Sequence, residues 1–507
     1  MREIKKFINA TVHTQGCNLK CDYCYLAQHM YSNNKSRLAL RNPVEYVLKA
    51  FSPERMGGIC YITLVGDGET LLPDDIEDFI VGLVKQGHYL TIITNGTLVE
   101  KIIHIIERLK EINLQNHIYF SLSLHFLEIV RLGLKDRFTQ CVNFLKEENI
   151  SVGITLVLAN SYIPVIEEIK IYCDELGIVP SVNLAINEHE DGEVEHIVEV
   201  SDEEYREMEK RLTGQKSVTS KLNNFYTKET GFCYAGVWSI ILDITTGECG
   251  QCVNNSDHVF NFYDNIEKPL ELLPVGNRCK AAYCICGFRD AWHLVPEKEF
   301  ITEKETISPS DRFLSEETRR RFRTDLAKSN EEYSDTMKEA INQKNYELQL
   351  LQIKIQTAVK ELSRADKVRG LKLAEELFEV DLDSHNSRVV QLIVTYGYAL
   401  IEMENYDEAE TLYGCWDDLK YSADYCFMMG TVFLKEGNIE LAISCFEAAS
   451  NSHVAVEEGI NSWLPDYNLG VIYECLGDMK KAGSYYKKCE NYCKAVERLQ
   501  IIEGNKK

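Results

Sequence analysis

Basic residues, proline and long apolar runs are all scarce in this chain of 507 residues. Its 55 lysines and arginines are outnumbered by 79 aspartates and glutamates, which gives a formal net charge of -24. Such a surface repels phosphate backbones and anionic lipid heads, so we expect neither nucleic acid nor a membrane as a partner. No run reaches the roughly 18 apolar residues of a membrane span, and the N-terminus lacks the pattern of a secretion signal. We therefore expect a cytoplasmic protein.

Disulfide bonds are not expected either, although the chain has 18 cysteines, because thiols stay reduced in the cytoplasm. Cysteines that cluster in such a protein are typical ligands of a metal or an iron-sulfur cluster. The chain is too long for one ordinary domain, and with 45% hydrophobic and 26% charged residues it can bury sizeable cores. The composition therefore predicts a globular protein of roughly two to four domains.

Three cysteines near the N-terminus, Cys17, Cys21 and Cys24, have the spacing C-x3-C-x2-C at the end of an apolar run. Three thiolates bind three irons of a cube-shaped iron-sulfur cluster and leave the fourth iron open. The spacing, with the aromatic Tyr23 just before the last cysteine, resembles the radical SAM superfamily. The resemblance implies a [4Fe-4S] cluster that binds S-adenosylmethionine (SAM) and cleaves it to a 5'-deoxyadenosyl radical. A zinc site or three unrelated thiols is the alternative.

A regular alternation of strand and helix patterns surrounds this motif. Strands are predicted at residues 7–12, 61–65, 89–94, 118–124, 152–158 and 182–186, with helical patterns between them. Such strand-helix units indicate a parallel sheet with a site at the carboxyl ends of the strands. Periodicity alone fits a doubly wound open sheet equally well. The radical SAM resemblance favours the α/β partial barrel of the (β/α)6 form.

A glycine turn, Gly66-Asp67-Gly68-Glu69, follows the second predicted strand. Glycine lets the backbone approach a ligand closely, and a carboxylate can pair with an ammonium group. The turn resembles the glycine-glycine-glutamate motif that receives the SAM amino group in the family. Here Asp67 is inserted or substituted, and Thr70 stands where proline is commoner. The resemblance implies that Gly66, Gly68 and Glu69 contact SAM.

Further cofactor contacts are implied by the same resemblance. Asn95 lies in a turn after the third strand, residues 94–97, which is frequent in the superfamily but also fits a plain helix N-cap. Ser121 and Ser123 share one face of the fourth strand and are candidates for the SAM ribose or carboxylate; the alternative is that they only satisfy each other inside the barrel. Tyr23 is expected against the adenine.

A second group of cysteines follows a strongly acidic stretch. Its spacing resembles the SPASM extension of radical SAM maturases, or the shorter twitch form, because Gly247 and Cys252 match the interval that begins that motif. The full set of seven SPASM cysteines is not present, so the resemblance implies one auxiliary [4Fe-4S] cluster. Its ligands would be Cys233, Cys252, Cys279 and Cys284. Cys249 and Cys286 are spare, and one of them as a hydrogen donor is a rarer possibility. A four-thiolate zinc site is the alternative.

The last third of the chain contains a repeat. Gly397, Leu400, Ala409 and Tyr413 recur as Gly430, Phe433, Ala442 and Phe446, and again as Gly470, Tyr473, Ala482 and Tyr486. Small residues at the first and third places let two antiparallel helices approach, and aromatic residues are expected to fill the groove between successive helix pairs. The pattern resembles the tetratricopeptide repeat (TPR). Such stacks bind peptides or protein surfaces, or they only dimerise the protein.

Four parts are therefore expected: a radical SAM partial barrel (1–200), a small α+β auxiliary iron-sulfur domain of the SPASM or twitch type (201–300), a helical linker (301–365) and an all-α TPR-like superhelix (366–507). The resemblances imply hydrogen abstraction from a peptide or protein side chain (peptide maturation), with flavodoxin or ferredoxin as the one-electron reductant. Two alternatives stay open: a dehydrogenase or epimerase for a sugar or other polar metabolite, and a protein-binding TPR scaffold with a structural cluster. No residue is assigned a catalytic role.

Overall fold

The structure is a computed structural model. It describes residues 4–14, 16–24, 38–188, 194–196, 198–214, 228–253, 255–281, 284, 294–296, 312–329, 331–489 and 492–504. These residues fall into two compact units. The first comprises residues 1–245, 250–256 and 266–345, and the second comprises residues 246–249, 257–265 and 346–507.

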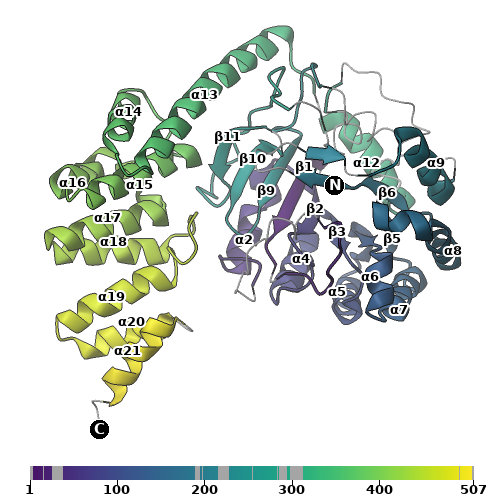
Figure 1. Cartoon of the computed structure of the whole chain (residues 1–507), viewed down its shortest axis with the longest axis horizontal. Coiled ribbons are helices and arrows are strands. Elements are labelled where there is room, and N and C mark those ends of the chain that lie inside the picture. The colour runs from purple at the N-terminus through teal and green to yellow at the C-terminus, as the bar shows by residue number, and fades with distance from the viewer. Residues whose placement is uncertain are drawn as a thin grey trace. The chain divides into compact units, whose positions relative to one another are not determined.

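One large sheet has the strand order β11-β10-β9-β1-β2-β3-β4-β5-β6 (Figure 1). The strands are β1 (Ile4–Val12), β2 (Ile59–Gly66), β3 (Tyr89–Thr94), β4 (Ile118–Ser123), β5 (Ser151–Leu158), β6 (Ser181–Leu184), β9 (Ser239–Asp243), β10 (Glu248–Cys252) and β11 (Asn255–Asn261). Strands β1 to β6 and β9 pair in parallel. The predicted parallel sheet of strand-helix units is therefore confirmed. A separate small sheet pairs β7 (Ile186–Glu188) with β8 (Val194–His196).

Helices separate the parallel strands, as expected from crossover connections. In the first unit they are α2 (Val44–Ala50), α3 (Pro53–Met56), α4 (Ile76–Lys85), α5 (Val99–Glu111), α6 (Phe126–Arg131), α7 (Lys135–Glu147), α8 (Ile166–Leu176), α9 (Asp202–Thr213) and α12 (Glu316–Ser329), with 3-10 turns η1 (Gln115–His117) and η2 (Asn160–Val165). Helix α5 illustrates why these segments are helical. Apolar residues recur along it at helical spacing and are all buried: Ile102, Ile105, Ile106 and Leu109. That apolar stripe packs α5 against the unit's core.

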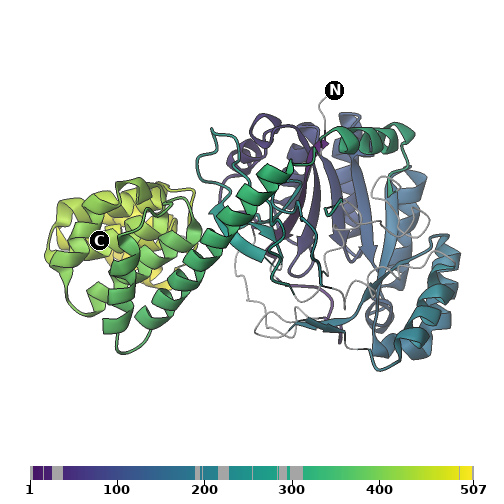
Figure 2. The same ribbon diagram turned by 90° about the horizontal axis from the view of Figure 1, so that it is seen from above.

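The two faces of the sheet differ in chemistry. One face is apolar and fully buried, with Ile62 on β2, Ile92 on β3 and Leu122 on β4, all at 0% exposure. The strand helices cover this face, and Figure 2 shows the strands as a curved wall with these helices along its outer side. The opposite face is polar, and Thr63 and Thr91 lie on it as paired neighbours. The inner face of the partial barrel is therefore the polar one.

The second unit is helical. Its helices are the distal part of α13 (Asp335–Leu362), then α14 (Val368–Phe378), α15 (Ser387–Glu402), α16 (Tyr406–Cys415), α17 (Ala423–Glu436), α18 (Ile439–Asn451), α19 (Trp463–Cys475), α20 (Met479–Lys488) and α21 (Cys493–Gly504), with a 3-10 turn η4 (Asp417–Tyr421). Successive helices from α15 on form antiparallel pairs (Figure 1). This confirms the predicted stack of helical repeats.

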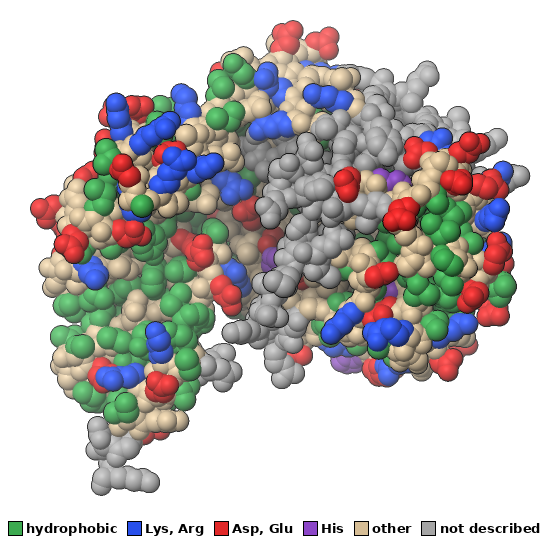
Figure 3. Space-filling view, viewed as in Figure 1, with side chains coloured by type: hydrophobic (Ala, Val, Ile, Leu, Met, Phe, Trp, Pro, Cys, Tyr) green, Lys and Arg blue, Asp and Glu red, His purple; other side chains and the backbone are tan. Residues whose placement is uncertain are grey.

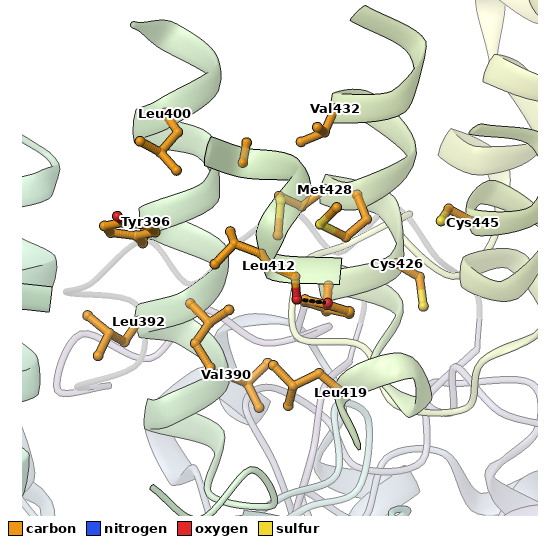
Figure 4. Packing of buried hydrophobic residues seen from close by; sticks show 14 of the residues in the cluster. Val390, Leu392, Tyr396, Leu400, Leu412, Leu419, Cys426, Met428, Val432 and Cys445 are labelled. Carbon is orange, nitrogen blue, oxygen red and sulfur yellow. Dashed lines mark hydrogen bonds between the residues drawn. The ribbon is translucent and has the colours of Figure 1, made fainter. Parts of the chain in front are cut away.

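Glycines let the paired helices approach. An added Cβ on Gly430 would lie 2.9 Å from the ring of Phe446, and one on Gly470 would lie 2.5 Å from the ring of Tyr486. Each glycine therefore faces the aromatic residue of its own repeat, within one helix pair rather than between pairs as expected. Gly397 differs, because its close neighbour is Met428 of the next repeat, at 2.4 Å from such a Cβ. Figure 4 shows Met428 in this core beside Leu412 and Cys426.

The surface of the repeat unit keeps some apolar side chains. Met403 is 48% exposed and Leu476 is 58% exposed. Figure 3 shows hydrophobic side chains gathered over the middle of this unit. Within the described ranges, no helix is both long enough and apolar enough to cross a membrane.

Candidate functional site

The loop that carries Cys17, Cys21 and Cys24 follows directly after β1, at the carboxyl ends of the parallel strands. The loop is held there by hydrogen bonds. Some form within its own turns, and others join its backbone and side chains to residues that follow β2, β3 and β4. Binding sites of open parallel sheets occur at this edge. The sequence therefore places the three thiols where a ligand can reach them.

The turn after β2 supports the start of the loop. The backbone N–H of Thr14 donates to the Asp67 carboxylate at 2.7 Å, and the N–H of Glu69 donates to the carbonyl oxygen of Gly16 at 3.0 Å. Gly68 lies so close to the loop that an added Cβ would be 2.2 Å from the Gly16 carbonyl oxygen. Only glycine fits at position 68, and its function here is to let two backbones meet.

The turns after β3 and β4 hold the middle of the loop. The Asn18 amide donates to the Thr97 hydroxyl at 2.7 Å and accepts from the Asn95 amide at 2.7 Å. The N–H of Lys20 donates to the carboxylate of Glu128 on α6 at 2.8 Å. Each neighbouring strand end thus contributes at least one hydrogen bond, which fixes the path of the backbone between the cysteines.

Glu69 lies beneath the cysteine loop, between the turns that follow β2 and β3, and its side chain is buried, with 1% exposure. One carboxylate oxygen accepts from the Thr94 hydroxyl at 2.5 Å and from the N–H of Leu71 at 3.1 Å, and the other accepts from the N–H of Asn95 at 2.8 Å. Burial raises the pKa of Glu69, and these hydrogen bonds counteract part of that rise. Among the described residues, no lysine, arginine or histidine forms an ion pair with it. A buried carboxylate in such surroundings favours a cationic ligand.

Asn95 connects Glu69 with the first cysteine. Its backbone binds the Glu69 carboxylate, and its side-chain amide lies 3.8 Å from the sulfur of Cys17. The predicted cofactor residue Gly66 is tied to Thr70, the residue that replaces the commoner proline: the N–H of Gly66 donates to the Thr70 hydroxyl, which donates to the carbonyl of Ile93 on β3. Threonine in place of proline therefore anchors the turn after β2 to the neighbouring strand.

Tyr23 is held by two partners. Its hydroxyl lies 2.6 Å from Nδ1 of His125 and 2.9 Å from the hydroxyl of Tyr162. His125 follows β4 and stacks on the Tyr23 ring, with centroids 6.0 Å apart. Burial lowers the pKa of His125 to about 4, so the imidazole is neutral and accepts the Tyr23 proton in a hydrogen bond. The aromatic residue of the cysteine motif thus has a fixed orientation.

His13 fixes the stem of the loop. Its two ring nitrogens face Asp67 at 2.6 Å and Asp243, at the end of β9, at 2.7 Å. Hydrogen bonds to Asp243 and then to Asp67 raise the pKa of His13 to about 10. The imidazole is therefore doubly protonated at neutral pH and connects three strand ends.

Ser121 and Ser123 both lie on the polar inner face, as alternation predicts. The Ser121 hydroxyl is bonded to the hydroxyl of Thr155 on β5 at 2.9 Å. Ser123 is paired with Thr155 across the strands and lies closer to the carboxyl edge, partly exposed. Of the two, Ser123 is the more accessible from the cysteine loop.

The three thiols are free and close enough to affect one another's ionisation. Burial, and after it the nearby thiols of Cys17 and Cys24, raise the pKa of Cys21 to about 12. Burial likewise raises the pKa of Cys17. As bare thiols Cys17 and Cys21 are protonated, so cluster binding must release protons. No three cysteine, histidine or carboxylate groups in the described part of the chain stand at metal-holding distances. Three thiols are donors of the type that hold an iron-sulfur cluster, so the chemistry of the residues present fits that group.

The second group of cysteines also gathers. Cys233 bridges to Gly276 through two backbone hydrogen bonds, of 3.0 and 2.9 Å. Burial raises the pKa of Cys233, and one backbone hydrogen bond lowers it. The nearby thiols of Cys252, Cys284 and Cys279 raise it as well. All four are partly exposed. They lie near the start of β9 and the end of the antiparallel β10, at the amino ends of the parallel strands. The two groups of cysteines therefore occupy opposite edges of the sheet.

The spare cysteines do not join this group in the same way. Cys249 is fully buried, and alternation along β10 directs it to the opposite face from Cys252. Cys286 lies outside the described residues.

Sequence patterns did not point to His13, Asp243, His125, Glu128 and Tyr162. Each is a residue with a polar group at the last position of a strand or within five residues after it, which is the signal that would have selected them. Asp67 was noted only as a departure from the glycine motif. In the structure it binds both His13 and the loop backbone.

The fold and the site define the class: a parallel α/β partial barrel with a three-cysteine loop at the carboxyl edge of its sheet. The family described as "Radical SAM superfamily" matches residues 11–163, and the tetratricopeptide repeat family matches residues 423–451 and 467–495. The chain therefore contains a radical SAM domain followed by C-terminal tetratricopeptide repeats.

No curated protein matches the chain. Solved structures similar to it include SuiB of Streptococcus suis, with 18% identity, 52% of this chain and 65% of that chain covered, and a TM-score of 0.38. Another is anSMEcpe with bound AdoMet, with 17% identity, coverage of 51% and 78%, and a TM-score of 0.38. A third is MamA, with 16% identity, coverage of 31% and 82%, and a TM-score of 0.26. The match to SuiB thus spans slightly less than two thirds of that protein's length.

Proposed function

We propose that this enzyme holds a [4Fe-4S] cluster with Cys17, Cys21 and Cys24, cleaves SAM reductively, and abstracts a hydrogen atom from a peptide or protein side chain. The observation that supports this most is the buried carboxylate of Glu69 beside the cysteine loop. The ammonium group of SAM would supply the cation that Glu69 lacks among the described residues. When bound, the cluster and SAM supply one-electron chemistry and a 5'-deoxyadenosyl radical.

The chain's own residues position these groups. Gly66 and Gly68 keep the turn after β2 close to the loop, and Glu69 and Asn95 offer polar contacts at its base. Tyr23, fixed by its two hydrogen bonds, is proposed to pack against the adenine of SAM. Ser121 and Ser123 on the inner face are proposed to contact its ribose or carboxylate. A flavodoxin or ferredoxin in the cytoplasm would deliver the electron.

The second group of cysteines is proposed to hold one auxiliary [4Fe-4S] cluster. Its ligands would be Cys233, Cys252, Cys279 and Cys284, whose mutual influence on ionisation supports a shared site. Four thiolates leave no iron open, so this cluster would order the region or pass electrons rather than bind substrate. The orientation of Cys249 away from the face of Cys252 argues against its replacing that ligand.

A peptide or protein is the proposed substrate because the chain carries helical repeats with exposed apolar side chains. Repeat stacks of this kind bind extended peptides and protein surfaces. A sugar or other polar metabolite is the second candidate, and the polar inner face of the barrel favours it. Either substrate would present one C–H bond at the carboxyl edge of the sheet.

The test is anaerobic. The full chain, reconstituted with iron and sulfide, is incubated with dithionite and SAM, and 5'-deoxyadenosine is measured. The variant Cys17→Ala/Cys21→Ala/Cys24→Ala should lose the product, and Cys415→Ala, at an exposed cysteine of the repeat unit, should keep it. Zinc in place of iron, or a product yield unchanged in the triple variant, would refute the proposal. Mass spectrometry of added peptides and sugars then separates the two substrate classes.

A further inference from the structure

The inner face of the barrel ends in an aromatic floor at the amino ends of the strands. Tyr61, Tyr89 and Tyr119 occupy the same face as the threonines and serines that follow them on β2, β3 and β4. Phe313 and Phe322 of the α12 region pack beneath, with ring centroids 5.3 Å apart for Tyr61 and Phe322 and 5.1 Å apart for Tyr89 and Phe322. This floor closes the end of the barrel opposite the cysteine loop.

Arginine side chains contact the rings of this floor. Arg321 donates to the Tyr89 hydroxyl at 3.1 Å, and its guanidinium carbon lies 5.5 Å from the centroid of that ring. The guanidinium carbon of Arg312 lies 5.8 Å from the centroid of the Tyr119 ring. Its other close neighbour is the Tyr61 hydroxyl, within hydrogen-bonding reach. Arginine stays protonated under all conditions in a protein. Arg319, seven residues on, pairs with Glu316. Across the described ranges, by contrast, no carboxylate forms an ion pair with Arg312.

The Tyr119 hydroxyl adds a second donor at the same place. It lies over Gly153 of β5, where an added Cβ would be 2.0 Å from the hydroxyl oxygen. Glycine at this position makes room for the hydroxyl on the inner face. No hydrogen-bond acceptor for it occurs in the described part of the chain. A guanidinium and a phenol with spare donors, enclosed by aromatic rings, form a site that favours an anion.

We propose that Arg312 and Tyr119 bind a carboxylate group of the substrate at the floor of the barrel. The inference rests on the proposed function, because it takes the substrate to enter from the edge that carries the cysteine loop. Asp243, an acidic residue of the inner face, is occupied by His13 at that opposite edge. Among the described residues, Arg312 and Arg321 are the cations that contact the floor, so a negatively charged group on the substrate is attracted there.

The distance between the floor and the carboxyl edge of the sheet determines how far from the anchored carboxylate the attacked C–H bond lies. Tyr119 lies four residues before Ser123 on β4. That separation corresponds to roughly 13 Å along a strand. An extended peptide covers about 3.3–3.6 Å per residue, so an anchored carboxylate would lie about four residues from the group that reaches the carboxyl edge. The anchored group is either the C-terminal carboxylate of a peptide or the side chain of an aspartate or glutamate.

Binding of a small carboxylate tests the site without turnover. The full-length reconstituted protein is titrated with acetyl-triglycine, with its C-terminal amide, and with glutarate, and the shift of the unfolding midpoint is recorded. The free acid should raise the midpoint and the amide should not. Protection by glutarate as well would point to a side-chain carboxylate, and protection by acetyl-triglycine alone to a C-terminus. No shift with either acid in the wild-type protein overturns the proposal.

Variants locate the effect. Arg312→Gln should weaken acetyl-triglycine binding roughly tenfold or more, because it removes a charge-assisted hydrogen bond. Tyr119→Phe keeps the ring and should weaken it several-fold. Arg320→Gln, at an exposed arginine of α12, should bind as the wild type does. Iron content and circular dichroism check that each variant is folded. Unchanged acetyl-triglycine binding in both folded variants overturns the assignment. Failure of the proposed function would appear in a separate assay, in which the reconstituted protein, dithionite and SAM give no 5'-deoxyadenosine when no peptide is added.

Discussion

The Nδ1 atom of His13 lies 2.6 Å from the Asp67 carboxylate, which joins the stem of the cysteine loop to the turn after β2. The same imidazole reaches Asp243 at the end of β9, a strand that enters the sheet more than two hundred residues later. The position of the first cysteine group is therefore tied to the chain that leads into the second. The protonated imidazole makes this connection, because each of its two ion pairs with a carboxylate is also a directed hydrogen bond.

His13→Gln is expected to destabilise the barrel unit by on the order of 1 kcal/mol at neutral pH, since it removes a hydrogen-bonded charge that is partly solvent-exposed. The pH dependence gives the sharper test. A histidine whose pKa rises from 6.5 to about 10 on folding stabilises fully below pH 6.5 and loses that effect as the pH approaches 10. Wild-type stability should therefore fall more steeply over this window than that of the variant.

Chemical denaturation at several pH values between those limits measures the difference. His104→Gln is the matched control, because His104 forms its ion pair with Glu77 from a side chain that is 60% exposed. Parallel pH profiles for the wild type and His13→Gln would show that His13 is not held as a cation.

Gly68→Ala is expected to disturb the cysteine loop. The new Cβ would lie 2.2 Å from a backbone carbonyl, which cannot move as a side-chain end can. Overpacking of this kind costs roughly 1–3 kcal/mol. Iron bound per chain and the unfolding midpoint should both fall. Gly414→Ala is the control, because nothing lies within 4 Å of a Cβ there and the helix should gain about 0.5–1 kcal/mol. Equal effects of the two changes would contradict the close approach of Gly68 to the loop.

Glu69→Gln keeps the shape of the side chain and removes its charge. If Glu69 binds the SAM ammonium, the affinity for SAM should fall roughly tenfold or more, while the iron content should stay near that of the wild type. Anaerobic calorimetry with SAM measures the affinity. Glu100→Gln serves as the control, because that carboxylate is 76% exposed. An unchanged dissociation constant for Glu69→Gln would remove Glu69 from the cofactor site.

Two cysteines of β10 test the auxiliary site. Cys252→Ala should lower the iron content by about half, from about eight to about four irons per chain, since one of two clusters is lost. Cys249→Ala should retain the iron, because that side chain is buried on the other face of the strand. Iron and sulfide analysis of the anaerobically reconstituted proteins gives the answer. Iron loss in the Cys249 variant with retention in the Cys252 variant would exchange their roles.

Local patterns in the sequence were sufficient for much of the fold. The strand at residues 89–94 coincides with β3, because alternating helices and strands carry their own periodicity and turn signals. The cysteine spacing and the turn at Glu69 also lie within short stretches. Contacts between distant segments could not be read in this way. His13 and Asp243 are 230 residues apart, and no local pattern specifies that β9 pairs with β1. The aromatic floor was missed for the same reason, since α12 brings Phe313 and Phe322 to it from far along the chain.

A glycine in the repeat unit allows the effect of helix propensity on stability to be separated from the effect of side-chain packing between helices. Alanine in place of glycine within a helix normally stabilises by about 1 kcal/mol. At Gly430 the new methyl group would lie 2.9 Å from the Phe446 ring, so Gly430→Ala should instead destabilise the repeat unit, by roughly 1–2 kcal/mol. Adding Phe446→Leu should recover part of the loss, because the smaller side chain frees the space. Thermal unfolding of the single and double variants measures this coupling, and strictly additive effects would mean that Gly430 and Phe446 do not oppose each other across the helix pair.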